Sequence, residues 1–231
     1  MASAAPEATP LRVSVVITAW NSERHLGEAL ESVLAQTHPA AEVIVNDDGS
    51  TDGTAAVVRS FGSAVTLLSS PHEGIGAGRN RAIEHATGDL LAFLDADDRW
   101  HPRKLEVQVA ALRTDPALDA VFVAADEFVD AAGASRHRLP RLGIVGPLVS
   151  SLVLRSEAAA RVGPFDPTTT LGDWIDWWGR ATELGLRVAY LDEVLADRRL
   201  HEHNNSVVNG RDAAQYLRVV WERIDRARTQ P

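Results

Sequence analysis

The sequence contains no cysteine, and this absence excludes several kinds of chemistry at once. A chain without thiols has no disulfide, no thiolate nucleophile and no cysteine-ligated zinc, and its composition leaves the redox compartment open. Long apolar runs are also absent, so no segment reaches the roughly 18 residues that a membrane-spanning helix needs. The stretch 1–10 has neither a positively charged region nor an apolar core, so it does not look like a secretory signal.

Basic charge is scarce as well. The sequence has 23 Lys and Arg residues and 32 Asp and Glu residues, and the net charge of −9 argues against a nucleic-acid partner. The 231 residues, 45% of them apolar, are enough for one domain with a substantial core. We therefore expect a disordered tail at 1–10, a single domain at 11–210 with a nucleotide-binding half (11–115) and an acceptor half (116–210), and a packed helix at 211–231. We also expect a cytoplasmic location, and peripheral contact with a membrane stays open.

Strand and helix patterns alternate along the first half of the chain. Apolar, β-branched runs predict strands, and each is followed by a pattern with helical spacing. The predicted strands are 13–19, 42–46, 65–68 and 90–94. This alternation predicts an α/β fold with a mostly parallel sheet and helices on both faces. The second half is less regular. Strands are predicted at 120–125, 148–154 and 187–191, a short helix follows the strand at 148–154 and ends at about 162, a further helix is predicted at about 172–184, and 130–146 is a polar surface excursion.

The strand predicted at 90–94 ends abruptly in a cluster of acidic residues, Asp95-Ala96-Asp97-Asp98. Three carboxylates at the tip of a buried strand repel one another, and a hard cation such as Mg²⁺ or Mn²⁺ would relieve that repulsion and bridge to phosphate oxygens. Ligands in open α/β sheets bind outside the carboxyl ends of the strands, where this cluster falls. A solvated acidic turn is the alternative interpretation.

A second acidic pair, Asp47-Asp48, follows the strand predicted at 42–46. Parallel strands place their carboxyl ends on one edge, so one ligand could contact both acidic clusters, with Asp47 or Asp48 accepting hydrogen bonds from a base or ribose. The glycine-rich stretch 72–78 and Arg79 could approach the same nucleotide, because glycine permits close backbone contact and arginine offers a planar fork of donors. Taken alone, this stretch is more simply a turn before a helix.

The helix predicted at 172–184 carries two candidate catalytic carboxylates. Asp173, Asp176 and Arg180 share one face of this helix. An adjacent apolar face carries Trp174, Trp177, Trp178 and Ala181. A plain amphipathic helix with an Asp–Arg pair outside explains this pattern, but a partly buried carboxylate beside the tryptophans, its pKa raised by burial and lowered by Arg180, could also act as a general base.

The stretch 198–205 is rich in charge and imidazole. His201 and His203 lie two residues apart, which places them on one side of an extended segment. One imidazole could join the aspartates as a metal ligand, and Arg198 or Arg199 could hold a diphosphate. A solvated basic loop is the alternative.

Taken in order, these motifs resemble those of the family 2 glycosyltransferases, which are inverting enzymes with a GT-A fold. The resemblance covers about 13–206. It rests on an opening strand followed by Trp20-Asn21, the Asp-Asp-Gly-Ser-Thr-Asp loop at 47–52, Arg79-Asn80, the DADD motif at 95–98 and the Trp-x-Pro-x-Lys-Leu segment at 100–105.

The resemblance implies roles for individual residues. The nucleotide-sugar contacts would be Thr18, Ala19, Trp20, Asn21, Asp47, Asp48, Gly49, Arg79, Asp95, Ala96, Asp97 and Arg199. Mn²⁺ or Mg²⁺ would be bound by Asp95, Asp97 and His201, the last from the segment Arg199-Leu200-His201. The family's Glu-Asp pair, whose Asp is the base, looks like Gly172-Asp173 here. Because Gly172 stands where the family has Glu, Asp176 remains the second candidate, and Asn46 is a further departure.

The implied function is metal-dependent transfer of a sugar from a nucleoside-diphosphate sugar, most often a UDP-sugar, to an acceptor hydroxyl. A nucleotidyltransferase would share the nucleotide and the metal, but Trp20-Asn21-Ser22 is not the basic glycine-rich loop expected after its first strand. A phosphotransferase with an aspartyl nucleophile would carry that aspartate after the first strand instead of the fourth. A non-catalytic protein that binds sugar nucleotides is an alternative from a different class.

Overall fold

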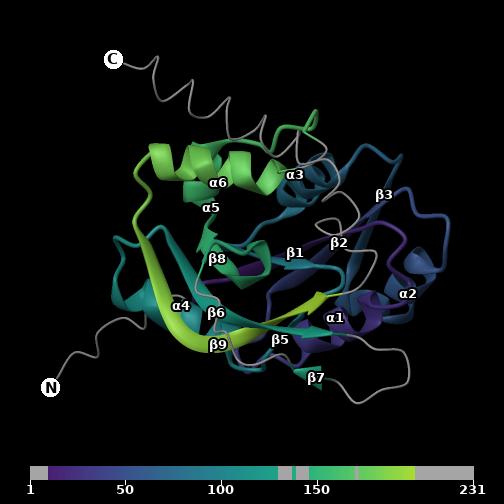
Figure 1. Cartoon of the computed structure of the whole chain (residues 1–231), viewed down its shortest axis with the longest axis horizontal. Helices are drawn as coiled ribbons and strands as arrows, with labels where there is room; N and C mark the ends of the chain where they lie inside the picture. The colour runs from purple at the N-terminus through teal and green to yellow at the C-terminus, as the bar shows by residue number, and fades with distance from the viewer. Residues whose placement is uncertain (1–9, 130–136, 139–145, 170–171, 201–231) are drawn as a thin grey trace, which may run out of the picture.

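The computed structural model describes residues 10–129, 137–138, 146–169 and 172–200, and these form three layers with a twisted sheet between two layers of helices (Figure 1). The strands are β1 (Val13–Ala19), β2 (Glu42–Asp48), β3 (Thr66–Ser70), β4 (Leu90–Asp95), β5 (Arg99–Trp100), β6 (Ala120–Val129), β7 (His137–Arg138), β8 (Leu152–Arg155) and β9 (Val188–Leu200). The α-helices are α1 (Leu26–Leu34), α2 (Thr54–Ser60), α3 (Ile75–His85), α4 (Lys104–Thr114), α5 (Ser156–Val162) and α6 (Asp173–Glu183), with short 3₁₀ turns at η1 (Gly62–Ala64) and η2 (Val149–Ser151).

The first half of the sheet is parallel, as the sequence predicts. Its strand order is β3-β2-β1-β4, and β1 pairs in parallel with both β2 and β4. The β1 sequence, VSVVITA, is buried on both faces along nearly its whole length, which explains why it is a continuous apolar and β-branched run. The carboxyl ends of β1, β2 and β4 therefore share one edge of the sheet.

The second half of the sheet, which the sequence predicts to be less regular, combines parallel and antiparallel strands. Strand β8 pairs antiparallel with β4 and with β6, β5 pairs antiparallel with β9, and only the long β6–β9 pair is parallel there. The strand predicted at 148–154 begins instead as the 3₁₀ turn η2, where the Ser151 hydroxyl bonds to the Leu148 carbonyl and competes with a sheet ladder. The strand predicted at 187–191 is much longer, because β9 follows β6 through an irregular register to Leu200.

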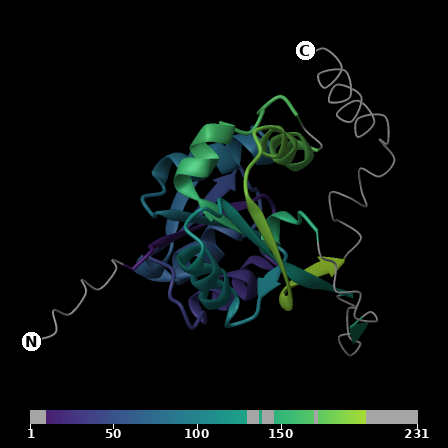
Figure 2. The same ribbon diagram turned by 90° about the vertical axis from the view of Figure 1, so that its left-hand side faces the viewer.

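Helices cover both faces of the sheet. In Figure 1, α3, α5 and α6 lie above it, and α1, α2 and α4 lie below it; Figure 2 shows the same layers from the side. Alternate residues of β1 feed the two cores, since Val15 and Ile17 belong to the core with α1 and α4, whereas Val16 belongs to the core with α3, α5 and α6. These contacts confirm the α/β class.

Several predictions concern residues outside the described part of the chain. They are the tail at 1–9, most of the excursion at 130–146, His201 and the helix at 211–231. Within the described ranges, no helix combines the length and apolar character needed to cross a membrane.

Candidate active site

Thr18 marks the point where the two acidic clusters meet. In the parallel ladder it lies beside Asn46 of β2 on one side and beside Asp95 of β4 on the other. Helix α3 passes so close that a Cβ added at Gly78 would lie 2.5 Å from the Thr18 methyl carbon and 2.9 Å from the Asn46 amide nitrogen. The Thr18 hydroxyl is buried and has no hydrogen-bond partner among the described residues. Ala19, the last residue of β1, is buried directly behind this edge.

The loops after β1 and β2 bind each other through Asn21. The Asn21 N–H donates to Ser50 Oγ at 2.8 Å, and the Asn21 side-chain oxygen accepts from the Thr51 N–H at 2.9 Å. Asn21 has a φ of +48°, a conformation that asparagine tolerates better than most residues. The Ser22 N–H adds a 2.8 Å bond to Thr54 Oγ1. Asn21 thus shapes the two loops that would surround a nucleotide.

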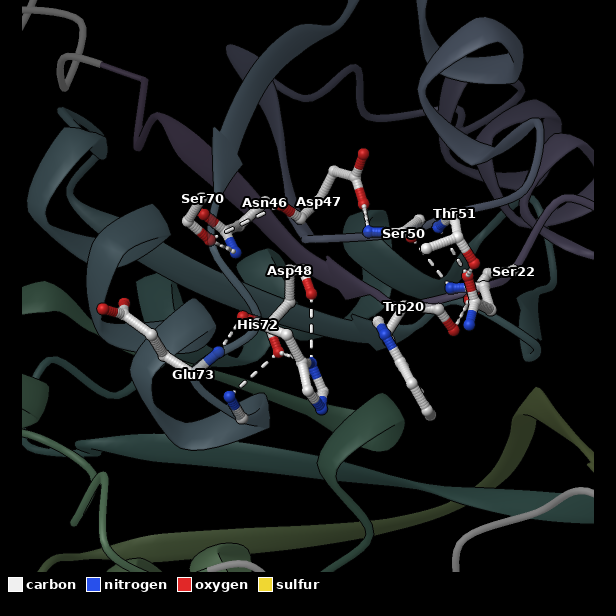
Figure 3. Close-up of polar contacts among 12 residues, drawn as sticks. Trp20, Ser22, Asn46, Asp47, Asp48, Ser50, Thr51, Ser70, His72 and Glu73 are labelled. Atoms are coloured by element: carbon white, nitrogen blue, oxygen red, sulfur yellow. Dashed lines mark hydrogen bonds and ion pairs between the residues drawn. The ribbon is translucent and has the colours of Figure 1, made fainter.

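Asp48 is buried, and its carboxylate organises the glycine-rich stretch before α3. One oxygen accepts from the Glu73 N–H and the other from the Gly74 N–H, both at 2.9 Å, and His72 Nδ1 also lies 2.9 Å from the carboxylate (Figure 3). Gly49 has a φ of +75°, and a Cβ there would lie 2.6 Å from the His72 nitrogen. The stretch at 72–78 is therefore a turn before a helix, held against the end of β2 by Asp48.

Asp47 and Trp20 line the same corner. The Asp47 carboxylate accepts from the Ser50 N–H at 3.0 Å, and its side chain diverges from that of Asp48 in Figure 3. Trp20 is 51% exposed and stacks on the His72 ring with centroids 4.5 Å apart. An exposed aromatic ring beside a carboxylate suits a nucleobase, which offers a flat face and polar edges.

Arg79 connects the metal-binding candidates to the base candidates. Its guanidinium is buried and forms ion pairs with Asp95 at 3.0 Å and with Asp173. Burial opposes the charge on Arg79, but Asp173 and Asp95 outweigh that effect and raise the pKa of the guanidinium. The pattern of the helix gave no indication of this partner: Asp173 pairs with Arg79, whereas Arg180 pairs with Asp176.

Asn80, the next residue, ties α3 to the turn that leads toward α6. Its side-chain amide donates to the Phe165 carbonyl and accepts from the Phe165 N–H, both at 2.8 Å. The Arg79 guanidinium lies 5.4 Å from the centroid of the Phe165 ring. Arg79 and Asn80 therefore both connect α3 to Phe165, which lies far from them in the sequence.

Asp98 and Ser150 hold the turn that carries the DADD motif. The Ser150 hydroxyl donates to the Asp98 carboxylate at 2.7 Å and accepts from the Asp95 N–H at 3.1 Å. Asp98 also accepts from the Arg199 N–H at 2.9 Å. Burial raises the pKa of Asp98 well above its usual value, and the charges of Asp97 and Asp95 add to that rise. Asp98 is thus a structural acid beneath the motif.

Asp95 and Asp97 are the members of the motif that reach the surface. The Asp95 side chain is 37% exposed, Asp97 is also partly exposed, and Ala96 between them is buried. Burial raises the pKa of Asp95, Asp97 adds to this rise, and Arg79 opposes it. Two carboxylates suit Mg²⁺ or Mn²⁺, which keep several waters and take phosphate oxygens. In the described ranges, no group of three metal-ligating side chains occurs, and the third predicted ligand, His201, lies outside them.

Arg199 lies in strand β9 and not in a solvated basic loop, so that alternative was wrong for the described part of the segment. Arg199 is only 3% exposed. Its guanidinium donates to the Asp97 carbonyl at 2.8 Å and to Glu28 at 2.5 Å, and it lies over the Phe128 ring. In this position Arg199 supports the DADD turn from beneath. Its contact with a diphosphate remains a prediction.

The α6 helix has the mixed character that its sequence indicates. Asp176 pairs with Arg180 at 3.1 Å, as the spacing predicts. Trp177 is buried, and Trp174 stacks on Trp177 and on Trp178 with centroids 5.7 Å and 5.8 Å apart. The tryptophans therefore pack mainly against one another and the core. Asp173, at the first position of the helix, is the carboxylate directed toward α3.

Two residues of the site escaped the sequence interpretation. Ser150 lies in η2, within a stretch predicted as strand, and Glu28 lies on α1 and accepts from both Arg99 and Arg199. A serine in an apolar run gave a weak signal for Ser150. For Glu28 no local signal exists, because its partners lie 71 and 171 residues away in the sequence.

The parallel strands β3-β2-β1-β4 carry acidic loops at one edge, and the sheet with its flanking helices has the GT-A fold of the solved structures that it resembles. The protein-family model for glycosyl transferase family 2 matches residues 14–163. The chain therefore belongs to glycosyl transferase family 2, a family of glycosyltransferase enzymes.

Relatives and solved structures agree with this assignment. An uncharacterized glycosyltransferase of Nostoc is 31% identical over 84% of this chain and 66% of its own length, and the putative glycosyltransferase EpsE of Bacillus subtilis is 31% identical over 80% and 71%. Among solved structures, mannosyltransferase PcManGT of Pyrobaculum calidifontis superposes with a TM-score of 0.72 at 21% identity, covering 94% of this chain and 65% of the other. S. aureus TarS (residues 1–349) gives a TM-score of 0.67 at 22% identity, with coverages of 84% and 60%. The chain thus spans about two thirds of the length of these proteins.

Proposed function

We propose that this chain is a metal-dependent inverting glycosyltransferase that moves a sugar from a nucleoside-diphosphate sugar to an acceptor hydroxyl. The single observation that carries this proposal is the contact of one guanidinium, Arg79, with both Asp95 and Asp173. This contact brings a strand-end carboxylate suited to a cation and a carboxylate suited to proton transfer into one site.

The nucleotide would lie along the edge formed by the ends of β1 and β2. Asp47 and Asp48 would face its base and ribose, with Trp20 beside the base and Thr18, Asn21 and Gly49 shaping the floor. The solved relatives favour a uridine or guanosine diphosphate sugar, because TarS was solved with UDP and UDP-GlcNAc and PcManGT with GDP-Man and Mn²⁺. The relative WfgD of Escherichia coli, 37% identical over 43% of this chain and 40% of its own length, is named for UDP-Glc. We favour a UDP-sugar.

Asp95 and Asp97 would hold the cation, with His201 as a further ligand. A divalent cation there would offset negative charge on the departing diphosphate. Asp173 would accept the proton of the acceptor hydroxyl while the hydroxyl oxygen attacks the anomeric carbon. The bond from that carbon to the diphosphate oxygen breaks on the opposite face, which inverts the anomeric centre. We prefer Asp173 to Asp176 because Asp176 pairs with Arg180 on its own helix, whereas Asp173 is joined to Asp95 through one side chain.

A thermal-shift panel with UDP, GDP, dTDP and CMP tests this proposal, each nucleotide being measured with Mn²⁺ and with EDTA. A ligand that binds only the folded state raises the unfolding midpoint. We expect one diphosphate to raise it in Mn²⁺ and to lose that effect in EDTA. Folded protein that responds to none of them at millimolar concentration would overturn the proposal. A cytoplasmic location is a further prediction and is not addressed by this experiment.

A further inference from the structure

We propose that Arg79 is a positioning residue that holds Asp173 in place for proton transfer and couples it to the cation-binding carboxylate Asp95. This inference rests on the proposed function, because it takes Asp173 as the base. It assigns Arg79 a different role from the nucleotide contact that the family resemblance implies. The distinction can be measured, since a nucleotide contact affects binding and a positioning contact affects turnover.

The contacts of Arg79 leave its guanidinium little capacity for a ligand. One terminal nitrogen is paired with Asp95 and the other with Asp173, and the Arg79 side chain is only 6% exposed. Asp173 is also buried. A nucleotide that bound directly to this guanidinium would have to displace one of two charged, largely desolvated partners, and such displacement is costly.

The backbone of Arg79 is fixed as firmly as its side chain. One residue before it, Gly78 lies against Thr18 and Asn46 without room for a side chain. One residue after it, Asn80 forms two hydrogen bonds with the backbone of Phe165. Helix α3 is therefore anchored on both sides of Arg79. The Arg79 guanidinium reaches Asp173 from this fixed helix. Such a support suits a group that must keep a catalytic carboxylate in one orientation.

The two ion pairs also make Asp173 sensitive to the state of Asp95. Arg79 lies between two carboxylates that would otherwise repel each other. If Asp95 served as a cation ligand, its pair with Arg79 would weaken, and Asp173 would become the main partner of the guanidinium. Cation binding at Asp95 would thus strengthen the ion pair between Arg79 and Asp173. Asp173 begins α6, and in the proposed mechanism it takes the proton of the acceptor.

The experiment compares Arg79→Met, Arg79→Lys and the matched control Arg81→Met. Arg81 lies on the same helix and pairs with Glu73 at the surface, outside the proposed machinery. Affinity for UDP with Mn²⁺ is measured by calorimetry, and turnover is measured as the release of UDP from UDP-glucose with water as acceptor. In that reaction the water oxygen joins the anomeric carbon, the water proton goes to Asp173, and UDP departs with the electron pair. If the nucleotide panel selects GDP, then GDP and GDP-mannose replace these probes.

We expect Arg79→Met to keep its affinity for UDP with Mn²⁺ while kcat falls about 100-fold, within the range attributed to a positioned general base. Arg79→Lys should recover part of kcat, since an ammonium can restore one ion pair, and Arg81→Met should behave as the wild type. In an Asp173→Asn background, Arg79→Met should cause little further loss, because both changes act on one step. Loss of nucleotide affinity with unchanged kcat, or full additivity of the two changes, would overturn the inference.

Hydrogen exchange separates failure of this inference from failure of the proposed function. If Arg79 holds the start of α6, amides at 173–178 should exchange faster in Arg79→Met than in Arg81→Met, while amides of β1 stay protected in both. This result needs no activity. An unchanged exchange rate at 173–178 would overturn the inference even if the wild type transfers sugar. A wild type that neither binds nucleotide nor releases UDP would overturn the proposed function, with the exchange result still deciding whether Arg79 positions Asp173.

Discussion

The Ser150 hydroxyl donates a 2.7 Å hydrogen bond to the carboxylate of Asp98, and both groups are buried beneath the DADD turn. The same hydroxyl accepts from the Asp95 N–H at 3.1 Å. One side chain from η2 thereby binds the backbone of the first residue and the carboxylate of the last residue of a motif that lies more than fifty residues earlier in the chain. The geometry that we propose for cation binding by Asp95 and Asp97 therefore depends on this contact with η2.

Replacing Ser150 with alanine should therefore weaken both the fold and the metal site. The change leaves the buried carboxylate of Asp98 without one partner, and such a loss costs about 1–3 kcal/mol. We expect urea denaturation to report that loss in the free energy of unfolding, and calorimetry to report weaker Mn²⁺ binding. Ser60→Ala is the matched control, because the exposed Ser60 hydroxyl bonds only to the Val57 carbonyl one turn earlier. Equal stabilities of the two variants would contradict the role given to Ser150.

Asp173→Asn and Asp176→Asn should separate the two base candidates. Asparagine cannot take the acceptor proton, so we expect Asp173→Asn to lose roughly 10²–10⁴-fold in kcat, the range of general-base catalysis. Its affinity for the nucleotide with Mn²⁺ should remain. Asp176→Asn removes the negative charge from the ion pair with Arg180 on the same helix, and this variant should keep most of the turnover. If Asp176→Asn is the inactive variant instead, Asp176 is the base.

The sequence predicts which residues lie at the carboxyl ends of the parallel strands, because strand patterns and strand direction determine their place. Apolar runs predict the strands, and parallel pairing brings the ends of β2 and β4 to one edge of the sheet. Asp47, Asp48 and Asp95 therefore lie at the same edge, with β1 between them. The Asp176–Arg180 pair follows in the same way from helical spacing. These features depend only on residues that are close in the sequence or on the direction of neighbouring strands.

The interior of the site could not be predicted in this way. Arg79 and Asp173 lie 94 residues apart, and their contact depends on how α6 packs over α3. A solvated loop is one of the two interpretations that the sequence allows for Arg199, because charged residues are seldom fully buried. The ion pair with Glu28 and the contact with Phe128 allow its burial in β9. Such contacts belong to the tertiary fold and leave no periodic pattern in the sequence.

Gly78 provides a test of the packing between α3 and the sheet. A Cβ at Gly78 would lie 2.5 Å from the Thr18 methyl carbon, so Gly78→Ala should force the helix away from β1 and cost about 1–3 kcal/mol, as overpacked cores do. Gly27→Ala on α1 is the control, since its nearest atom would be 3.9 Å away. That change should stabilise the protein by about 0.5–1 kcal/mol through helix propensity. The thermal unfolding midpoint should therefore fall in Gly78→Ala and rise in Gly27→Ala. Equal shifts of the two midpoints would contradict the close approach of α3 to β1.

Lys104 is the only lysine in the sequence, and it is fully buried at the start of α4. Its ammonium nitrogen has no hydrogen-bond partner in the described part of the chain and lies 4.0 Å from the centroid of the Trp100 ring. Burial lowers the pKa of Lys104 well below its usual value. The unfolded chain then binds one more proton than the native state at every pH between the lowered pKa and the unfolded value near 10.4.

The free energy of unfolding should therefore rise with pH in that window, by about 1.4 kcal/mol for each pH unit. Lys104→Met keeps the volume of the side chain but cannot titrate, so it should abolish this part of the slope and raise stability at about pH 7. Urea denaturation of both proteins from about pH 7 to about pH 10 measures the difference. Parallel pH profiles for the two proteins would contradict the prediction. Amine acylation provides an independent check: Lys104 should react only when the protein is unfolded, since the native fold hides its nitrogen behind Trp100.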